Sequence, residues 1–426
     1  MQNVKDFGAA GDGKTNDTVA LQKAIDAGGT VYLPAGVYIS GTLYLKSNGG
    51  LLLAPGATIK ASHNREDYNA LDYCPQNEKC DEEFMVGTHL ITAVEQENVF
   101  ICGHGTIDGD SHFWVNDSLK YSEYDFWGHP TLEAQRPGQM IYFVECTNVQ
   151  VKDVTLTYAP FWHLFFHGCE NVQACGLKIK GETKQWVNDG IDIDCCSRVT
   201  VSDCIIETGD DAITLRANGK KTKRKVCEDI TITNCILTSY LDYGIRIGVG
   251  GGVIRNALFS NIIIKDSLYG MGMTCRFSPQ GDCASVENIR FDNISVKALR
   301  AFEMKLSDQP NHPPLKSPAY IKNVSMSNFY IESNRYCILQ GFENGMVSGL
   351  RFFAGQIKFI QEDENNDRHA CNYYSRAINE KDAAIYLEKI DGAVFDGVEI
   401  DRGPFAKAII YDEAENVRFC ERWEKI

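Results

Sequence analysis

The chain has 426 residues, of which 44% are apolar, so it can form a large core and is not expected to be disordered. Its 42 Lys and Arg residues against 57 Asp and Glu residues give a net charge of -15. This charge argues against a general binder of nucleic acid or anionic membranes, because such proteins need a basic surface. No run of about 18 apolar residues is present, so no transmembrane helix is expected.

The first residues, Met1 to Val4, lead directly into patterned sequence and show no basic and apolar leader. The sequence therefore leaves two localisations open. The protein is secreted or periplasmic if a leader was removed, and otherwise it is cytoplasmic.

An N-terminal helix is predicted over residues 18–27, N-capped by Asn16 or Asp17 and ended by Gly28 and Gly29. We expect it to cap a stack of strands, because a terminal coil otherwise exposes apolar surface and unpaired strand edges. The apolar side chains expected to face that stack are Val19, Leu21, Ala24 and Ile25.

A short signature then recurs: a polar residue, alternating β-branched residues, and Asp or Asn. Its copies begin at Asn148, Asn171, Arg198, Asp229, Asn256, Asn288 and Asn323, at steps of 23 to 35 residues, with fainter copies at Gly392 and Asn416. Alternation at period two predicts half-buried strands, and a repeat without helical pattern predicts a solenoid with coils about 4.8 Å apart. We predict one all-β domain over 1–426, with the N-terminal cap and first coils in 1–60, catalytic coils in 98–300, and C-terminal coils and loops in 301–426.

The chain has 16 cysteines but is too long to be a disulfide-stapled miniprotein. Cys196 and Cys204 have the same spacing of eight as Cys227 and Cys235, which predicts a buried ladder of small core residues. A few disulfides between neighbouring coils remain an alternative. No Cys or His cluster has zinc spacing, so no metal site is predicted.

Several segments together resemble a known family. They are the opening Val4-Lys-Asp-Phe-Gly-Ala-Ala-Gly-Asp-Gly, Gly103-His-Gly-Thr-Ile-Asp-Gly, Arg136-Pro137, Ala159-Pro-Phe-Trp162, Asp189-Gly-Ile-Asp and Gly209-Asp-Asp211. In this order they resemble glycoside hydrolase family 28, the pectin-degrading polygalacturonases and rhamnogalacturonases, over roughly residues 1–300. The resemblance implies a single-stranded right-handed parallel β-helix.

Three aspartates, Asp189, Asp210 and Asp211, suit hydrolysis of a glycosidic bond. An inverting reaction needs one carboxylic acid to protonate the leaving oxygen and a carboxylate to activate water. Mutual repulsion of such close carboxylates helps one of them to keep a proton. By alternation Asp189 and Asp211 would point inward, so we expect Gly190 and Gly209 to permit a turn that rotates the acids outward.

The roles of these acids come from the resemblance, which implies that Asp210 is the general acid and that Asp189 and Asp211 hold and deprotonate the water. The residues alone leave open whether Asp210 or Asp211 is the acid.

The sequence also departs from the family. The Asn-Thr-Asp motif reads Val187-Asn188-Asp189, the family histidine is Tyr243, and the Arg-Ile-Lys motif that grips a uronate falls at Gly272-Met273-Thr274. A rhamnogalacturonan or pectic side-chain linkage is therefore favoured over ordinary endo-cleavage of polygalacturonan.

Candidate substrate-binding residues lie near the acids. Arg216, Arg246 and Arg276 are predicted to form an outward basic row that pairs a carboxylate, with solvated arginines as the alternative. Trp162, His163, Trp186 and Tyr243 are candidates for stacking on or hydrogen-bonding a sugar, with ordinary core residues as the alternative for the aromatic rings. The basic run Gly219–Lys225 is interpreted as a solvated mobile loop or as a rim that attracts acidic polysaccharide.

The leading hypothesis is an inverting glycoside hydrolase that needs no cofactor and acts on a pectic or related acidic polysaccharide as a monomer. A polysaccharide lyase, which would use Ca²⁺ and release unsaturated products, is one alternative. A non-catalytic glycan-binding β-helix is the other, although it would not need three clustered acids.

Overall fold

The structure, a computed structural model, describes residues 1–70, 74–77, 87–114, 137–218, 221–276, 282–307, 314–315, 317–343, 345–362, 382–420 and 423–425. These residues are mostly parallel β-strand, which confirms the predicted fold class. The chain divides into two compact units, Met1–Asp210 with Lys220–Arg224, and Asp211–Gly219 with Lys225–Ile426. The single domain over 1–426 stays a prediction.

The first unit stacks coils of short strands. Its elements are β1 (Gln2–Asn3), η1 (Val4–Phe7), β2 (Asp12–Asn16), α1 (Thr18–Asp26), β3 (Thr30–Leu33), β4 (Gly36–Ser40), β5 (Leu43–Tyr44), β6 (Gly49–Leu53), β7 (Ala57–Ala61), η2 (Arg65–Asp67), η3 (Pro75–Asn77), β8 (Ile91–Val94), β9 (Glu97–Gly103), β10 (Thr106–Asp108), α2 (Ser111–Trp114), β11 (Ile141–Val144), β12 (Thr147–Lys152), β13 (Thr155–Thr157), β14 (Leu164–His167), β15 (Glu170–Cys175), β16 (Lys178–Lys180), β17 (Ile191–Asp194), β18 (Ser197–Ser202) and β19 (Ile205–Thr208).

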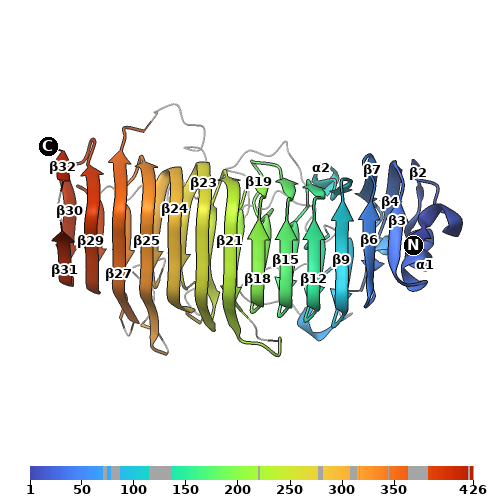
Figure 1. The fold of residues 1–426 in the computed structure, drawn as a ribbon, viewed down its shortest axis with the longest axis horizontal. Helices are drawn as coiled ribbons and strands as arrows, with labels where there is room; N and C mark the ends of the chain where they lie inside the picture. Colours follow the sequence, from blue (N-terminus) through green and yellow to red (C-terminus); the bar gives the residue numbers. More distant parts are fainter. Residues whose placement is uncertain are drawn as a thin grey trace. The chain divides into compact units, whose positions relative to one another are not determined.

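Three parallel ladders run through this unit. They are β3-β6-β9-β12-β15-β18, β4-β7-β10-β13-β16-β19 and β5-β8-β11-β14-β17. In Figure 1, β9, β12, β15 and β18 lie side by side as members of the first ladder. Each strand thus meets its partner one coil away, which places residues distant in sequence at the same edge of a sheet.

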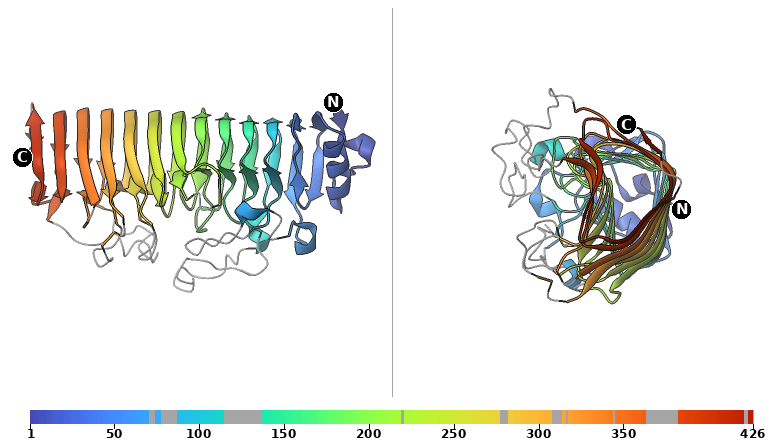
Figure 2. Two further views of the ribbon diagram at one scale, coloured as in Figure 1. Left: turned by 90° about the horizontal axis from the view of Figure 1, so that it is seen from below. Right: turned by 90° about the vertical axis from the view of Figure 1, so that its left-hand side faces the viewer.

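The second unit contains β20 (Ile213–Ala217), β21 (Val226–Ser239), β22 (Tyr243–Gly250), β23 (Val253–Thr274), β24 (Ser285–Lys305), β25 (Ala319–Ser333), β26 (Cys337–Gln340), β27 (Gly345–Phe359), β28 (Ala383–Glu388), β29 (Ile390–Asp401), β30 (Lys407–Asp412), β31 (Glu415–Cys420) and β32 (Trp423–Lys425). Its pairings are parallel as well, for example β23 with β24 and β27 with β29. In the right view of Figure 2 its orange to dark red strands lie one behind another.

The repeated signature marks a left-handed backbone position near the start of a strand. Its starting residues all have φ in the left-handed region, between 53° and 86°: Asn148, Asn171, Arg198, Asp229, Asn256, Asn288, Asn323, Gly392 and Asn416. Asn and Gly tolerate this conformation best. The Asn side chains also bond from coil to coil, as Nδ2 of Asn148 donates to Oδ1 of Asn98 at 2.9 Å and Oδ1 of Asn148 accepts from Asn171 at 3.0 Å. The signature therefore indicates the residue at which the backbone of each coil adopts the left-handed conformation.

The predicted N-terminal helix is present as α1, with Asp17 at the N-cap position and Gly28 and Gly29 after its end. Oδ1 of Asn16 accepts a hydrogen bond from the N–H of Thr18 at 3.0 Å. Leu21, Ala24 and Ile25 are buried, but Val19 is 67% exposed, so its predicted inward position is wrong.

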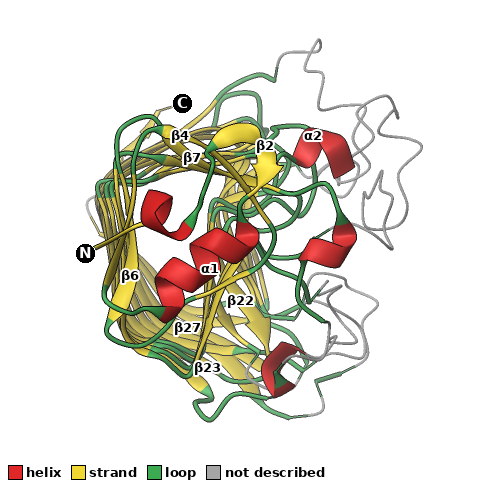
Figure 3. Cartoon of the chain, turned by 90° about the vertical axis from the view of Figure 1, so that its right-hand side faces the viewer, coloured by secondary structure: helices red, strands yellow, loops and turns green. Residues whose placement is uncertain are grey.

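Figure 3 shows α1 in front of β4, β6 and β7, and its function as a cap stays a prediction. No helix within the described ranges has the length and apolarity needed to cross a membrane.

The predicted cysteine positions are buried. Cys196, Cys204, Cys227 and Cys235 lie in the cores of their units. Cys146 and Cys169 occupy the two coils before Cys196, and the N–H of Cys169 donates to Sγ of Cys196 at 3.2 Å. Burial raises the pKa of the Cys169 thiol well above its ordinary value, so this thiol stays protonated. The ladder of small core residues is confirmed for these positions.

The asparagine turn makes a testable contribution to stability. Asn148→Ala removes two side-chain hydrogen bonds and places an alanine in a left-handed turn, so we expect a loss of about 2 kcal/mol in urea unfolding. Asn148→Gly is the matched control, since glycine keeps the turn and loses only the hydrogen bonds. We expect it to retain about half of that stability. Equal losses in both variants would contradict a contribution from backbone conformation.

Candidate active site

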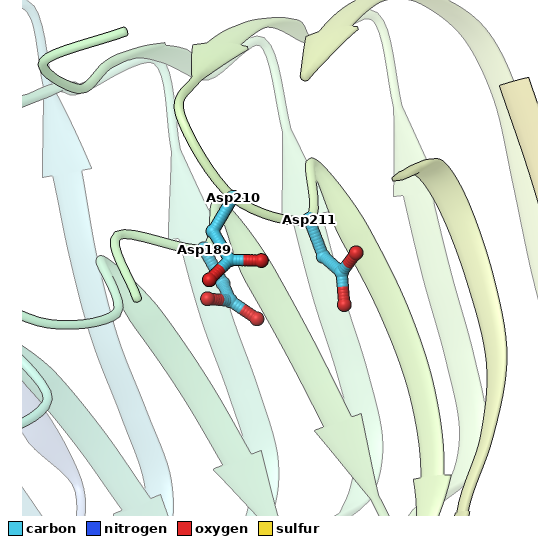
Figure 4. A group of neighbouring side chains, drawn as sticks. All are labelled: Asp189, Asp210 and Asp211. Atoms are coloured by element: carbon cyan, nitrogen blue, oxygen red, sulfur yellow. The ribbon is translucent and has the colours of Figure 1, made fainter. Parts of the chain in front are cut away.

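The structure brings the three predicted acids together. One carboxylate oxygen from each of Asp189, Asp210 and Asp211 lies within 4.8 Å of the other two, and Figure 4 shows the three side chains. Asp210 ends the first unit and Asp211 begins the second, joined by a peptide bond. Clustered carboxylates are what acid–base hydrolysis of a glycosidic bond requires, and we interpret the group as an acid–base site.

The predicted outward rotation of the acids holds only in part. Asp210 is half-buried, whereas Asp189 is 4% exposed and Asp211 is 1% exposed. The prediction is therefore wrong for Asp189 and Asp211, which are buried. For Asp211, hydrogen bonds and an ion pair within its own unit compensate the burial.

Asn188 fixes the turn that carries Asp210. Its Oδ1 accepts hydrogen bonds from the N–H groups of Gly209 at 2.8 Å and Asp210 at 3.0 Å, and its Nδ2 donates to the carbonyl of Glu182 at 2.7 Å. A Cβ at Gly209 would lie 2.0 Å from the carbonyl oxygen of Gln185, so only glycine fits there. The sequence showed Asn188 as a departure from a motif, and its clamping contacts were not predicted.

Val187 contacts Asp210 through its backbone. Its N–H donates to Oδ2 of Asp210 at 2.7 Å. The φ of Val187 is 58°, a left-handed value that is unfavourable for a β-branched residue and costs about 1–3 kcal/mol. Strain of this kind persists only where surrounding structure enforces it, and here it aims a hydrogen-bond donor at the carboxyl group.

His163 supports the backbone at Asp189. It is wholly buried, its Nδ1 donates to the carbonyl of Asp189 at 2.9 Å, and its Nε2 accepts from the N–H of Ala159 at 3.3 Å. Burial lowers its pKa to about 4, so the ring is neutral at pH 7. The predicted contact of His163 with a sugar is therefore wrong in this conformation, because the ring positions the strand instead.

The two candidate tryptophans are buried as well. Trp162 packs edge-on against Phe165, with ring centroids 5.1 Å apart, in an apolar cluster that includes Phe161 and Tyr142. Trp186 is also buried. Their environment matches the alternative of core residues, and the structure gives no support for sugar stacking on either ring.

Asp211 is surrounded by donors from the second unit. Arg246 NH1 lies 3.3 Å from Oδ2, Thr214 Oγ1 donates to the same oxygen at 3.3 Å, and the N–H of Tyr243 donates to Oδ1 at 3.1 Å. Hydrogen bonds and a cation favour the charged form of a carboxyl group. The geometry therefore favours an ionised Asp211.

Tyr243 connects this pair to a second buried carboxylate. Its ring lies 5.5 Å from the Arg246 guanidinium and stacks on Tyr269 at 4.5 Å. Its hydroxyl donates to Oε1 of Glu303. A Cβ at Gly272 would lie 2.2 Å from the Tyr243 ring, so a glycine is needed where the ring crosses β23. Tyr243 thus contacts protein groups on both sides of the ring.

Glu303 belongs to a cluster that the sequence analysis missed. Arg300 NH1 lies 2.7 Å from Oε2, and Lys305 Nζ lies 3.0 Å from Oε1. Burial alone would raise the pKa of Glu303, but Lys305, Arg300 and the Tyr243 hydroxyl lower it to about 2. Charged residues alternating within an otherwise buried strand were the available signal.

Comparison with known proteins identifies the family. The sequence model described as Glycosyl hydrolases family 28 matches residues 52–329. The chain belongs to this family. Polygalacturonase QRT2 of Arabidopsis thaliana is 27% identical over 349 residues, covering 78% of this chain and 72% of that protein. An exo-poly-alpha-D-galacturonosidase of Dickeya chrysanthemi is 24% identical over 380 residues, covering 78% and 62%.

Solved structures confirm the parallel β-helix of this family 28 glycoside hydrolase. The family 28 exopolygalacturonase of Yersinia enterocolitica superposes with a TM-score of 0.73 at 20% identity, covering 98% of this chain and 78% of that one. At 20% identity this similarity shows the fold alone.

In this glycoside hydrolase the three candidate arginines are all buried. Arg216 on β20 is 3% exposed, and Arg276, which bridges to Cys283, is 1% exposed. Both the predicted outward orientation of the row and the alternative of solvated arginines are therefore wrong. Arg246 pairs with Asp211 as described, while substrate contacts of Arg216 and Arg276 stay predictions.

The basic run after β20 folds against the first unit. Lys223 Nζ lies 2.5 Å from Glu95 and 2.9 Å from Glu145, and Arg224 lies 3.2 Å from Glu170. Thr222 is buried. Residues 219 and 220 lie outside the described ranges. Ion pairs join Lys223 and Arg224 to acids on successive coils although the Lys223 side chain is 77% exposed, and the polysaccharide rim stays a prediction.

The buried neutral His163 predicts a dependence of stability on pH. Its folded pKa of about 4 lies below the ordinary 6.5, so the unfolded state binds more protons between these values. The stability that His163 contributes is complete above pH 6.5 and is lost as pH falls toward 4, by up to about 3 kcal/mol.

Urea unfolding of wild type and His163→Asn at pH 7 and pH 4.5 tests this expectation. We expect the variant to show a shallower decline between the two pH values. The exposed His104 provides the control, and His104→Asn should keep the wild-type decline. A wild-type decline in His163→Asn would contradict the assignment.

Proposed function

We propose that this family 28 enzyme hydrolyses a glycosidic bond of an acidic pectic polysaccharide with inversion, with Asp210 as the general acid. The observation that carries the proposal is the clustering of Asp189, Asp210 and Asp211 in unequal surroundings. Asp211 is buried and receives a guanidinium and two further donors, whereas Asp210 is half-buried.

This asymmetry assigns the proton. Ionised Asp211 disfavours a second charge beside it, so a shared proton resides best on Asp210. Asp210 is also the more exposed of the three acids, as a group that must reach the glycosidic oxygen should be. Asp210 gives its proton to that oxygen as the bond to the anomeric carbon breaks. Asp189 and Asp211 take a proton from the water that attacks the opposite face of the sugar.

A retaining hydrolase is the second candidate, favoured by one observation. Carboxyl groups of retaining enzymes are about 5–5.5 Å apart and those of inverting enzymes about 6.5–9.5 Å, whereas the nearest oxygens here lie within 4.8 Å. Retention requires a carboxylate that attacks carbon directly. Both oxygens of Asp211 already accept hydrogen bonds, and Asp189 is buried. Their position suits a bound water better than a covalent bond.

The substrate class follows from the relatives, which are named for action on polygalacturonan. Gly272, which falls at the position of the missing Arg-Ile-Lys motif, makes room for the ring of Tyr243. The Arg246 guanidinium lies over that ring, and the Tyr243 hydroxyl donates a hydrogen bond to Glu303. This arrangement supports a pectic linkage other than homogalacturonan, such as rhamnogalacturonan, as the preferred bond.

Replacing the proposed acid tests the assignment. Asp210→Asn should lower kcat by at least about 10²-fold on a panel of pectic polysaccharides, because it removes the proton donor. Reducing-end assays give the rate, and Glu97→Gln, an exposed carboxylate on β9, should keep wild-type activity. Near-normal turnover of Asp210→Asn would refute the role of Asp210.

Product analysis separates the remaining alternatives. NMR of the first product should show the anomer opposite to that of the substrate, and retention would favour the covalent mechanism. Unsaturated, chelator-sensitive products would indicate a lyase, and binding without any products would indicate a glycan-binding protein.

Arg246 should set the acid limb of the pH profile. Arg246→Gln removes the cation beside Asp211, so Asp211 should take up a proton at higher pH and the acid limb of kcat/KM should move up by about one pH unit. Arg255→Gln breaks a comparable ion pair with Glu228 at 2.7 Å in the same unit and serves as control. Coincident profiles for wild type and Arg246→Gln would rule out this coupling.

A further inference from the structure

A buried row of residues links Glu303 to the arginine that faces Asp211. Arg246 on β22, Gly272 on β23 and Glu303 on β24 are register partners on successive coils of the second unit. Neighbouring parallel strands lie about 4.8 Å apart, so two coil spacings separate Arg246 from Glu303. The ring of Tyr243 occupies the space that a Cβ at Gly272 would need. One aromatic ring therefore fills the gap between the cation and the carboxylate.

Tyr243 is held at both of its ends. Its backbone N–H donates to Oδ1 of Asp211 at 3.1 Å, and its hydroxyl donates to Oε1 of Glu303. The Arg246 guanidinium lies 5.5 Å from the ring centroid, and its NH1 lies 3.3 Å from Oδ2 of Asp211. Nε of Arg246 donates to Oγ1 of Thr274 at 3.2 Å. The ring that packs against the guanidinium is thus anchored by the carboxylate of Glu303.

Glu303 is itself fixed by two cations. Arg300 NH1 lies 2.7 Å from its Oε2, and Lys305 Nζ lies 3.0 Å from its Oε1. The Arg300 guanidinium lies 5.8 Å from the ring centroid of Tyr269 and 4.4 Å from that of Tyr336. Burial raises the pKa of Glu303, but the two cations and a tyrosine hydroxyl lower it to about 2, so this carboxylate is charged at neutral pH.

Stability alone does not account for this buried carboxylate. Glu303 is 2% exposed and Arg300 is 3% exposed. Removing two charges from water costs free energy that their attraction barely offsets, and apolar residues of similar volume are often equally stable. An apolar residue at position 303 would, however, give the Tyr243 hydroxyl no acceptor. The carboxylate therefore has a specific effect, which is to fix the orientation of the tyrosine ring.

We propose that Glu303 is a positioning residue for catalysis, which acts through the Tyr243 hydroxyl to hold the ring against Arg246. The anchored ring keeps the Arg246 guanidinium on Asp211, and Asp211 stays ionised to accept a proton from the attacking water. Loss of the anchor lets the ring turn and the guanidinium move, so Asp211 takes up a proton at higher pH. This inference rests on the proposed function, which makes Asp211 one of the residues that activate the water.

The charged neighbours of Asp211 come from three segments. Arg246 faces it from β22 and favours its charged form. The carboxyl groups of Asp189 and Asp210 lie within 4.8 Å and favour its protonated form. Substitutions at Tyr243 and Glu303 leave these two acids in place. A change in the titration of Asp211 therefore reports a change at Arg246.

The test follows the Asp211 carboxyl group directly. Proteins labelled with carbon-13 at the aspartate carboxyls are titrated by NMR, and the Asp211 signal is identified as the one missing from Asp211→Asn. Tyr243→Phe removes only the hydroxyl. Glu303→Asp withdraws the acceptor by a methylene group, while Arg300 and Lys305 keep a carboxylate partner. We expect each variant to raise the midpoint of the Asp211 titration by about half a pH unit.

A double variant shows whether Glu303 acts through Tyr243. Because both substitutions break one contact, Tyr243→Phe combined with Glu303→Asp should raise the midpoint no further than either change alone. In the active enzyme, the acid limb of kcat/KM should move up by the same amount. Glu287→Asp is the matched control, since Glu287 also lies on β24 and its carboxylate pairs with Lys322 at 2.8 Å. It should keep the wild-type midpoint and acid limb.

Unchanged midpoints in both single variants, or additive shifts in the double variant, would overturn the assignment of Glu303. A shift of the same size in Glu287→Asp would overturn it as well. The titration needs no substrate, so it separates this inference from the proposed function. A protein in which Asp211 responds as expected but which releases no product would refute the proposed hydrolysis and leave the control of Asp211 by Glu303 standing.

Discussion

The register of parallel strands from coil to coil is the constraint on which the rest of the structure depends. Each strand pairs with the strand one coil away, so residues more than twenty positions apart in sequence become neighbours at one edge. Asparagines in left-handed turns keep this register by returning the chain at the same point in every coil. Asn188 and the Asp210 turn meet because of it, as do Tyr243 and Glu303.

The acids differ in function because they differ in neighbours. Asp210 sits half-buried on a peptide turn that Asn188 holds through the N–H groups of Gly209 and Asp210. Asp211 faces a guanidinium held by a stacked tyrosine. Two adjacent residues of the same type are thus suited to opposite proton-transfer roles, which is the condition for acid and base catalysis at one pH.

The sequence was sufficient for the fold and for the three acids, since turn residues and alternation are local signals. It was insufficient for the environment of the acids. Alternation assumes one buried face, yet β17 and β20 are buried at every position. Arg216, Arg276 and His163 were therefore expected near solvent but lie inside. Glu303 was missed because its contact with Tyr243 on another coil depends on the register, although its charge within a buried strand was visible in the sequence.

The fastening of Lys223 and Arg224 to Glu95, Glu145 and Glu170 has a consequence for synthesis. A ribosome makes the three glutamates well before it makes Lys223 and Arg224, so a nascent chain that ends before residue 220 has Arg198 to pair with Glu170 but lacks Lys223 for Glu95 and Glu145. The early coils can thus complete their charge balance only once translation has passed the segment that carries Asp189 and Asp210. The ion pairs of Lys223 and Arg224 in the first unit therefore form only after Asp189 and Asp210 have been synthesised.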